Sequence, residues 1–313
     1  MNYIILFMFS LVFTYYSRNL GHKLKIIDAP SPNKIHSIPI PRTGGLGILL
    51  TFVLGLLIFK ISLNIYDIIF LVLIFILGFL DDLFSITQKI KFIIEIFLAL
   101  IITLINNIRF TDVNIIDTIF AIFFIVGSIN ALNNIDGMDG LAGGLALISC
   151  FFMSYFVKDI ALIVAIACFG FLIWNFHPAK LFMGDGGSLF LGAFIALMGL
   201  KILNMNPSIH TLLALIFIYS VPIYDILLTI IRRYFNKKSI FGPDLGHFYN
   251  KLYDMSKNYK GTIFIIYISS IILGFIGLLI YKQPVSIGIS IAVIVWSLLL
   301  FLAYKLKFID VSM

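Results

Sequence analysis

The chain has 313 residues, of which 61% are hydrophobic and 12% are charged, and its formal net charge is +7. Soluble domains contain about 45–50% apolar and about 25% charged residues, so this composition excludes an ordinary soluble globular domain. It also excludes a disordered chain, which needs low hydrophobicity and high charge. Cys150 and Cys168 both lie in apolar runs, and we interpret them as buried small hydrophobic residues rather than as a disulfide or metal pair.

Long apolar runs separated by short polar breaks predict an all-α integral membrane protein. Because each bilayer crossing takes roughly 20 apolar residues, the runs predict one domain over residues 1–313, a polytopic bundle of about 11 transmembrane helices. The expected spans are residues 1–16, 45–59, 67–80, 92–106, 117–131, 141–157, 160–175, 188–203, 211–231, 262–281 and 285–304. The first run lacks a basic leader and a small-residue cleavage site, so it is expected to be a retained helix.

Basic residues are distributed unequally between the two sides of the predicted bundle. When alternate loops are placed on opposite sides, all but five of the 22 Lys and Arg residues fall on one side. The five on the other side are Lys60, Arg109, Lys158, Lys201 and Lys282. Short cytoplasmic loops carry an excess of Lys and Arg, so the N-terminus is expected outside and the C-terminus in the cytoplasm. The positive charge is therefore explained without nucleic acid.

Three acidic clusters fall on the predicted cytoplasmic side. Carboxylates near membrane depth are costly and usually functional. In the first cluster, Asp81 and Asp82 end the third span and are followed by Lys89 and Lys91. This cluster is either a solvated helix terminus or an acidic pair that attracts Mg²⁺, with lysines nearby for phosphate.

The second cluster follows the fifth span and combines amides with carboxylates. Asp136 and Asp139 are three residues apart and share a face if the stretch is helical, and Asn133 and Gly137 lie beside them. Glycine allows a ligand to approach the backbone closely, although small residues in membrane helices also serve packing. We interpret this cluster as functional.

The third cluster is a glycine-rich turn around Asp185 that opens a helix. Exposed backbone amides at a helix N-terminus favour an anion, and the carboxylate can hold a divalent ion that bridges to it. His177, which precedes a proline shortly before this turn, is expected to be structural.

Two other loops carry candidate residues. The loop after the ninth span contains Asp244 and His247, and a positioned histidine can bind a phosphate or carry a proton. The basic residues of this loop either contact anionic lipid headgroups or bind phosphate. Arg42, in a proline-stiffened loop, either positions substrate or fixes the loop.

This set of residues suits a phosphorylated, water-soluble donor that meets a lipid acceptor. Phosphoryl transfer needs mainly positioning and charge neutralisation, which acids, lysines and a histidine at the edge of a bundle can supply. The sequence has no Walker loop, so it does not indicate ATP hydrolysis. A membrane transporter is the rival class, and it predicts functional acids near mid-bilayer and paired broken helices.

The motifs together resemble those of the polyprenyl-phosphate N-acetylhexosamine-1-phosphate transferases, the group that contains WecA, TagO and MraY. The similar region runs from about residue 28 to residue 252 and includes Asp81-Asp82 with residues 89–92, then residues 130–142, 175–188 and 243–247. Eleven spans with the N-terminus outside resemble the WecA and TagO branch.

The resemblance implies a Mg²⁺-dependent reaction, with Mn²⁺ as the alternative ion, in the inner (plasma) membrane with the active site facing the cytoplasm. A UDP-N-acetylhexosamine would donate its sugar-1-phosphate, most simply GlcNAc-1-phosphate, to undecaprenyl phosphate and release UMP. Such a step begins the membrane stage of a cell-envelope polysaccharide. The implied partners are the UDP-sugar, undecaprenyl phosphate, membrane lipid and a second copy in a homodimer.

The family's pattern also implies roles for the matching residues. The catalytic candidates are Asp81, Asp82, Asp136, Asp139 and His247; the metal candidates are Asp185 and Asp81; and the substrate-binding candidates are Arg42, Lys89, Asn133, Gly137, Asn175, Phe182 and Asp244. By this pattern Phe182 would stack on uracil, and Lys89 and His247 would contact phosphates. In such enzymes Asp81 would act either as a base or as the nucleophile of a two-step route, or the lipid phosphate would attack directly. Because a phosphate monoester with a second pKa of about 6 is mostly dianionic at neutral pH, we favour direct attack by the lipid phosphate.

One departure concerns the last loop. Members near WecA usually show Asp-Arg-x-His-x-His-His, whereas residues 244–250 here read Asp-Leu-Gly-His-Phe-Tyr-Asn. The single histidine resembles the WbpL-like branch, which uses other N-acetylated sugars. The identity of the sugar therefore stays open.

Overall fold

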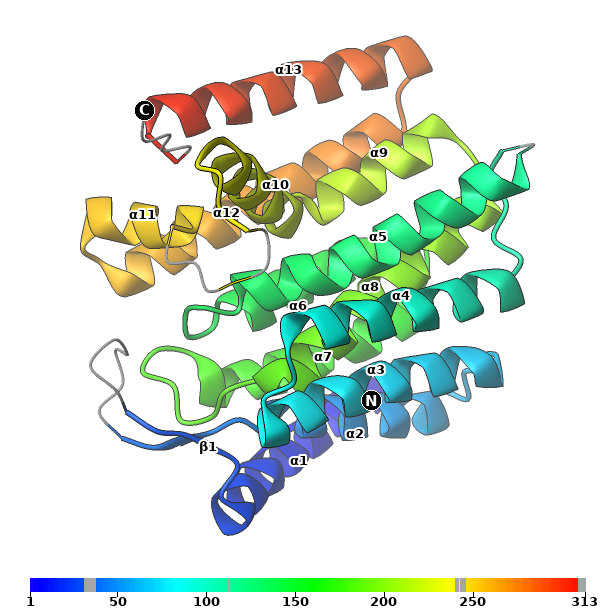
Figure 1. Ribbon diagram of the computed structural model, residues 1–313. Helices are drawn as coiled ribbons and strands as arrows, with labels where there is room; N and C mark the ends of the chain where they lie inside the picture. The colour runs from blue at the N-terminus through cyan, green and yellow to red at the C-terminus, as the bar shows by residue number, and fades with distance from the viewer. Residues whose placement is uncertain (31–37, 112, 240–241, 243–245, 309–313) are drawn as a thin grey trace.

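The computed structural model describes residues 1–30, 38–111, 113–239, 242 and 246–308, and within these ranges the chain is almost entirely helical (Figure 1). The helices are α1 (Asn2–Leu24), α2 (Gly44–Ile58), α3 (Ile65–Phe84), α4 (Gln88–Ile105), α5 (Asn114–Ile135), α6 (Leu141–Met153), α7 (Lys158–Asn175), α8 (Gly184–Met205), α9 (Ile209–Ile218), α10 (Ser220–Phe235), α11 (Phe248–Ser256), α12 (Tyr259–Tyr281) and α13 (Val285–Lys305). A short antiparallel hairpin pairs β1 (Ile27–Asp28) with β2 (Ile40–Pro41).

The predicted all-α class is confirmed apart from this hairpin, and each predicted span except residues 211–231 overlaps a single helix. In the described part of the chain, six helices are long and apolar enough to cross a membrane: α1, α5, α7, α8, α12 and α13. The bent pair α9 and α10 makes a seventh if it is one crossing, and α2 and α6 are apolar but shorter. The chain is therefore a multi-pass α-helical membrane protein.

The prediction of one helix over residues 211–231 is wrong. α9 ends at Ile218 and α10 begins at Ser220, and the two helices are bent by 81° at this break. Pro222 has no backbone N–H, so it cannot donate to the carbonyl of Ile218 as an unbroken helix requires. Proline is well tolerated in the first turn of a new helix, which is where Pro222 lies.

Helix α8 forms the centre of the bundle. Nearly all of its residues are buried, and α2, α3, α5 and α6 pack against it (Figure 1). A Cβ atom on Gly45 of α2 would lie 2.4 Å from the Cα atom of Gly187 in α8. Glycine at both positions therefore lets the two backbones meet, as small residues do in membrane helix packing. α13 is mostly exposed and lies at the edge of the bundle (Figure 1).

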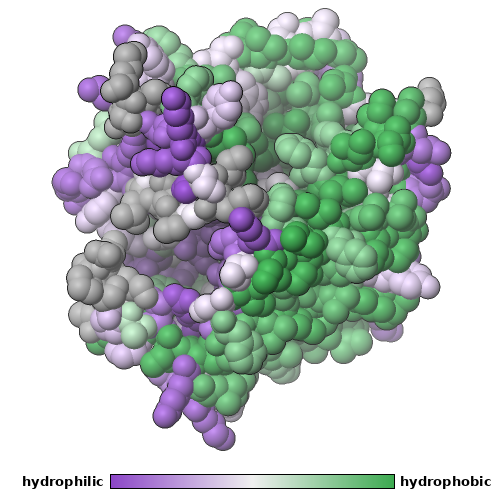
Figure 2. Space-filling model, viewed as in Figure 1, coloured by the Kyte–Doolittle hydropathy of each residue, from purple (hydrophilic) through white to green (hydrophobic). Residues whose placement is uncertain are grey.

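The polar connections gather at one end of the bundle. The hairpin, the α5–α6 turn, the α7–α8 loop and α11 all lie at the left in Figure 1. Hydrophilic residues concentrate at this end, and the rest of the visible face is largely hydrophobic (Figure 2). The α5–α6 turn of the second acidic cluster and the α7–α8 loop before the third therefore share one end of the molecule.

Candidate active site

The start of α8 places Asp185 beside α3. Gly184 has φ 72°, in the left-handed region that glycine adopts without strain. A Cβ atom on Gly78 of α3 would lie 2.3 Å from the carbonyl oxygen of Asp185, so α3 approaches the first turn of α8 closely. Oδ2 of Asp82 accepts a hydrogen bond of 3.2 Å from the Gly186 N–H. A carboxylate at this position suits the positive end of the helix dipole.

A buried lysine joins the first and third acidic clusters. Lys91 Nζ lies 2.8 Å from Asp81 Oδ2 and 2.5 Å from Asp185 Oδ2, and Lys91 is only 1% exposed. Two carboxylates, one from α3 and one from α8, therefore converge on one cationic group.

Lys91 was not among the candidates selected from the sequence, whereas Lys89 was. Both lie in α4, which begins four residues before the predicted span, and Lys89 is exposed. Residues two apart on a helix do not face the same way, so Lys91 can enter the acidic cluster while Lys89 faces outward. The sequence shows only that Lys91 and Glu95 are one turn apart. That both side chains are buried is seen in the structure.

The hairpin fixes the loop between α7 and α8. The N–H of Phe182 donates to the carbonyl of Pro41 at 2.8 Å, and the carbonyl of Phe182 accepts from the N–H of Gly44 at 2.9 Å. Arg42, between these two contacts, forms an ion pair with Asp28 of β1. The structure thus brings Arg42 and Phe182 into neighbouring chain segments, and Phe182 is half-buried there.

Asp139 ties the α5–α6 turn to the α7–α8 loop. Its Oδ2 atom lies 2.8 Å from His177 Nδ1 and accepts a hydrogen bond of 3.0 Å from the Ala179 N–H. The His177 ring stacks on Tyr259 with a centroid separation of 3.9 Å, and the Tyr259 hydroxyl accepts from the Asp139 N–H at 2.5 Å. Asp139 therefore has a structural task as well as any catalytic one.

Two amide side chains predicted to bind substrate also connect these segments. Buried Asn175 accepts from the Gly140 N–H at 2.9 Å and donates to the Leu181 carbonyl at 2.9 Å. Asn133 accepts from the Ser188 hydroxyl at 2.6 Å, which links α5 to the first turn of α8. Each side chain therefore links chain segments next to the first turn of α8.

Asp136 directly follows α5 and is half-buried. Burial raises the pKa of its carboxyl group well above its ordinary value, and the negative charges of Asp185, Asp82 and Asp139 raise this pKa further. The carboxyl group of Asp136 in the second cluster therefore interacts electrostatically with carboxylates of the first and third clusters.

His247 lies just before α11 and is buried. Its Nδ1 atom is 2.7 Å from Oδ2 of Asp225 on α10, a residue not selected from the sequence. The His247 ring stacks on Tyr249, whose hydroxyl donates to the Asn134 carbonyl at 3.3 Å. A Cβ atom on Gly137 would lie 2.1 Å from that hydroxyl, so Gly137 leaves room for Tyr249. Asp244 lies outside the described residues.

The donor set around Lys91 suits a hard divalent cation. Oδ1 of Asp81 is buried and has no hydrogen-bond partner among the described residues, and carboxylate oxygens are the ligands that Mg²⁺ prefers. Within the described ranges, no three His, Cys, Asp or Glu side chains form a metal-binding group. Mg²⁺ commonly binds one or two carboxylates and completes its shell with water and substrate phosphates, so Asp81 and Asp185 fit that pattern.

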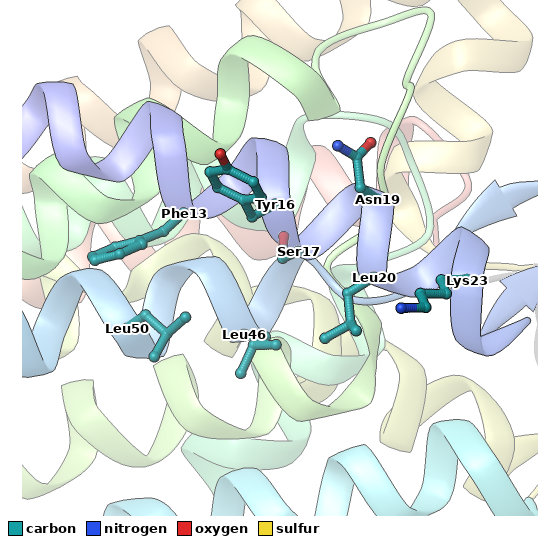
Figure 3. A pocket seen from close by; sticks show the side chains of 8 residues that line it. All are labelled: Phe13, Tyr16, Ser17, Asn19, Leu20, Lys23, Leu46 and Leu50. Atoms are coloured by element: carbon teal, nitrogen blue, oxygen red, sulfur yellow. The ribbon is translucent and has the colours of Figure 1, made fainter.

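A cavity of about 330 Å³ is lined by residues of α1 and α2 (Figure 3). Its lining residues are Phe13, Tyr16, Ser17, Asn19, Leu20, Lys23, Leu46 and Leu50. None of the candidate site residues belongs to this lining, so the cavity is separate from the site.

The fold and the site define a polytopic membrane protein with a carboxylate-rich centre at the polar end of its helix bundle. The sequence model of Glycosyl transferase family 4 matches residues 64–203, a range that includes all three acidic clusters. The chain belongs to this family, which confirms the resemblance to the WecA, TagO and MraY group.

Individual relatives agree with this assignment. A probable undecaprenyl-phosphate N-acetylglucosaminyl 1-phosphate transferase of Bacillus subtilis is 31% identical over 287 residues, which cover 85% of this chain and 80% of the relative. An undecaprenyl-phosphate alpha-N-acetylglucosaminyl 1-phosphate transferase of Thermotoga maritima is 30% identical over 229 residues, 72% of each chain. A phospho-N-acetylmuramoyl-pentapeptide-transferase of Helicobacter hepaticus is 42% identical over 94 residues, 29% of this chain and 24% of the relative.

Proposed function

We propose that this protein transfers N-acetylglucosamine-1-phosphate from UDP-N-acetylglucosamine to undecaprenyl phosphate and releases UMP. The observation that carries the proposal is the convergence of Asp81 and Asp185 on Lys91 at the polar end of a membrane bundle. A lipid acceptor and a water-soluble nucleotide sugar can meet only at such a boundary. The names of the Bacillus subtilis and Thermotoga maritima relatives support the same donor group and acceptor class.

The residues have distinct tasks in this proposal. Asp81 and Asp185 would hold a divalent ion, Mg²⁺ or Mn²⁺. When bound, the ion supplies charge neutralisation at the diphosphate. Lys91 keeps the two carboxylates at a fixed separation. The dianionic lipid phosphate needs no strong base, so its oxygen attacks the sugar-linked phosphorus directly and UMP leaves.

The loops around Asp139 supply the nucleotide pocket. Asp139 and Asn175 hold the α5–α6 turn against the α7–α8 loop, and Phe182 lies on the segment that they fix. Phe182 stacks on the uracil ring, and Asp136 and Asn133 face the donor from the end of α5. Arg42, Lys89 and Asp244 contribute from the surrounding segments, and His247 contacts phosphate.

The proposed topology has eleven crossings, with α9 and α10 together as one of them. The polar end of the bundle faces the cytoplasm from the inner (plasma) membrane, and the N-terminus lies outside. Labelling with a membrane-impermeant thiol reagent in intact cells tests this orientation. Lys282→Cys should react from outside and Lys257→Cys should not, and the reverse result would invert the topology.

UMP release tests the reaction itself. The purified protein is incubated with undecaprenyl phosphate, Mg²⁺ and one UDP-sugar, and UMP is measured over time. We expect release with UDP-N-acetylglucosamine that requires both the lipid phosphate and the ion. Release with a different N-acetylated sugar would instead place the chain with WbpL-like enzymes, and no release with any UDP-N-acetylhexosamine would end the transferase proposal.

A further inference from the structure

Asp225 is a fully buried carboxylate on α10 that contacts the segment containing His247. Its Oδ2 atom lies 2.7 Å from His247 Nδ1, and its Oδ1 atom accepts a hydrogen bond of 3.3 Å from the Phe248 N–H. An ionised carboxylate can only accept hydrogen bonds. With Asp225 in its ionised form, the proton of this contact lies on Nδ1 of His247.

The same face of α10 holds the backbone on both sides of this histidine. Asp225, Thr229 and Arg232 are spaced at i, i+4 and i+7, which places them on one side of the helix. The Thr229 hydroxyl is 3.4 Å from His247 Nδ1, and Arg232 Nη1 donates to the Gly246 carbonyl. Because α10 holds the backbone on both sides of residue 247, the imidazole ring has little conformational freedom.

One face of the His247 ring packs on Tyr249, which contacts the end of α5 next to the second acidic cluster. The ring packs parallel to Tyr249, with an angle of 11° between the planes and 5.1 Å between the centroids. Tyr249 in turn reaches the Asn134 carbonyl beside Asp136. Because Nδ1 is committed to Asp225, Nε2 is the ring nitrogen that remains to contact a ligand.

We propose that Asp225 is a positioning residue: it holds His247 with Nδ1 protonated and presents Nε2 to the phosphates of the bound donor. The inference rests on the proposed function for its last step, because the donor is the ligand that Nε2 meets. Paired acid–histidine contacts of this kind fix the tautomer and the ring orientation. A buried carboxylate is costly unless it is paired, and His247 supplies that partner.

Nuclear magnetic resonance of the ring nitrogens tests the tautomer without any need for catalysis. The protein is labelled with ¹⁵N-histidine, and the His247 signals are identified by their loss in His247→Ala. We expect protonated Nδ1 in the wild type and a mixture of tautomers in Asp225→Asn, because an amide can donate as well as accept. Unchanged ring signals in Asp225→Asn would overturn the proposal.

Kinetics test the consequence for transfer. We expect Asp225→Asn to lower kcat by about 10- to 100-fold, as for other residues that orient an active group, and to leave KM for undecaprenyl phosphate unchanged. Its effect should vanish in the His247→Ala background, since Asp225 acts only through that ring. Additive losses would overturn the proposal and would indicate a general structural role. Asp254→Asn on α11, an exposed aspartate paired with Lys257, is the matched control and should keep wild-type kcat.

A second variant keeps the test independent of how Asp225→Asn folds. His247→Asn retains a polar group near the position of Nδ1 and removes Nε2. We expect this variant to unfold at the wild-type temperature and to lose as much UMP release as His247→Ala. Retained activity would overturn the assignment of Nε2. A wild-type protein that releases no UMP would refute the proposed function instead, and the ring signals would still decide whether Asp225 sets the tautomer.

Discussion

Lys91 Nζ lies 2.5 Å from Asp185 Oδ2, although the two residues are 94 positions apart in the chain. The contact joins α4 to the first turn of α8, and Asp81 of α3 completes it at 2.8 Å from the same ammonium group. One buried cation thus holds together carboxylates that would otherwise repel each other. Its position links the stability of three helices to the geometry of the proposed metal site.

Lys91→Met should destabilise the protein, because it leaves two facing carboxylates without their buried counter-charge. Removing one partner of a buried ionic contact costs about 3–5 kcal/mol, so the unfolding temperature in detergent with a chelator should fall clearly. Added Mg²⁺ should raise that temperature more in Lys91→Met than in the wild type, since the ion can replace the missing positive charge. Lys257→Met, at an exposed lysine, is the control, and an equal loss there would refute the argument.

Asp185→Asn should abolish UMP release at every Mg²⁺ concentration while the protein remains folded. The amide oxygen still accepts a hydrogen bond from Lys91, but a neutral oxygen binds a divalent ion far more weakly than a carboxylate does. UMP release over a Mg²⁺ titration and the unfolding temperature are measured on the same sample. Full activity in this variant would show that the metal lies elsewhere.

Asp139→Asn should weaken the contact between the α5–α6 turn and the α7–α8 loop. In the wild type, Oδ2 of Asp139 contacts both His177 and Ala179. Losing a hydrogen bond to a charged group costs about 1.5–3 kcal/mol. We expect a lower unfolding temperature and a higher KM for the UDP-sugar. A normal KM together with a normal unfolding temperature would contradict this structural role.

Gly45→Ala should separate α2 from α8. Its Cβ atom would lie 2.4 Å from both N and Cα of Gly187, and backbone atoms cannot rotate away as a flexible side chain can. Overpacking of this kind costs about 1–3 kcal/mol. Gly127→Ala in α5 is the matched control: a Cβ there meets nothing within 4 Å, so the variant should gain about 0.5–1 kcal/mol of helix stability. Equal unfolding temperatures for the two variants would argue against close packing of α2 on α8.

Asp136 should make the metal-free protein less stable as the pH rises. Because its pKa is higher in the folded chain than in the unfolded chain, the folded state binds more protons between the two values. Stability therefore falls with rising pH from about pH 4 upward. Asp136→Asn cannot titrate, so its unfolding temperature should depend less steeply on pH. The two profiles are measured side by side with a chelator present, and parallel profiles would contradict the expectation.

The sequence did not predict the break between α9 and α10, nor that Lys91 rather than Lys89 is buried. Pro222 lies just after the break between α9 and α10, but the apolar run continues across it, so hydropathy alone predicts one helix. Lys89 and Lys91 have the same chemistry and nearly the same position, so the sequence could not rank them. Only the packing of α4 against its neighbours determines that Lys91 is buried and Lys89 exposed.

The sequence by itself determined the helical membrane class and the position of each acidic cluster at a helix end. It could do so because hydrophobicity along one segment and the conformational demands of glycine and proline are local properties. The tertiary structure alone decided which charges meet: Lys91 with Asp81 and Asp185, Asp139 with His177, and Asp225 with His247. Such pairs join residues from different helices, and their distances depend on how closely the backbones pack, which no single segment encodes.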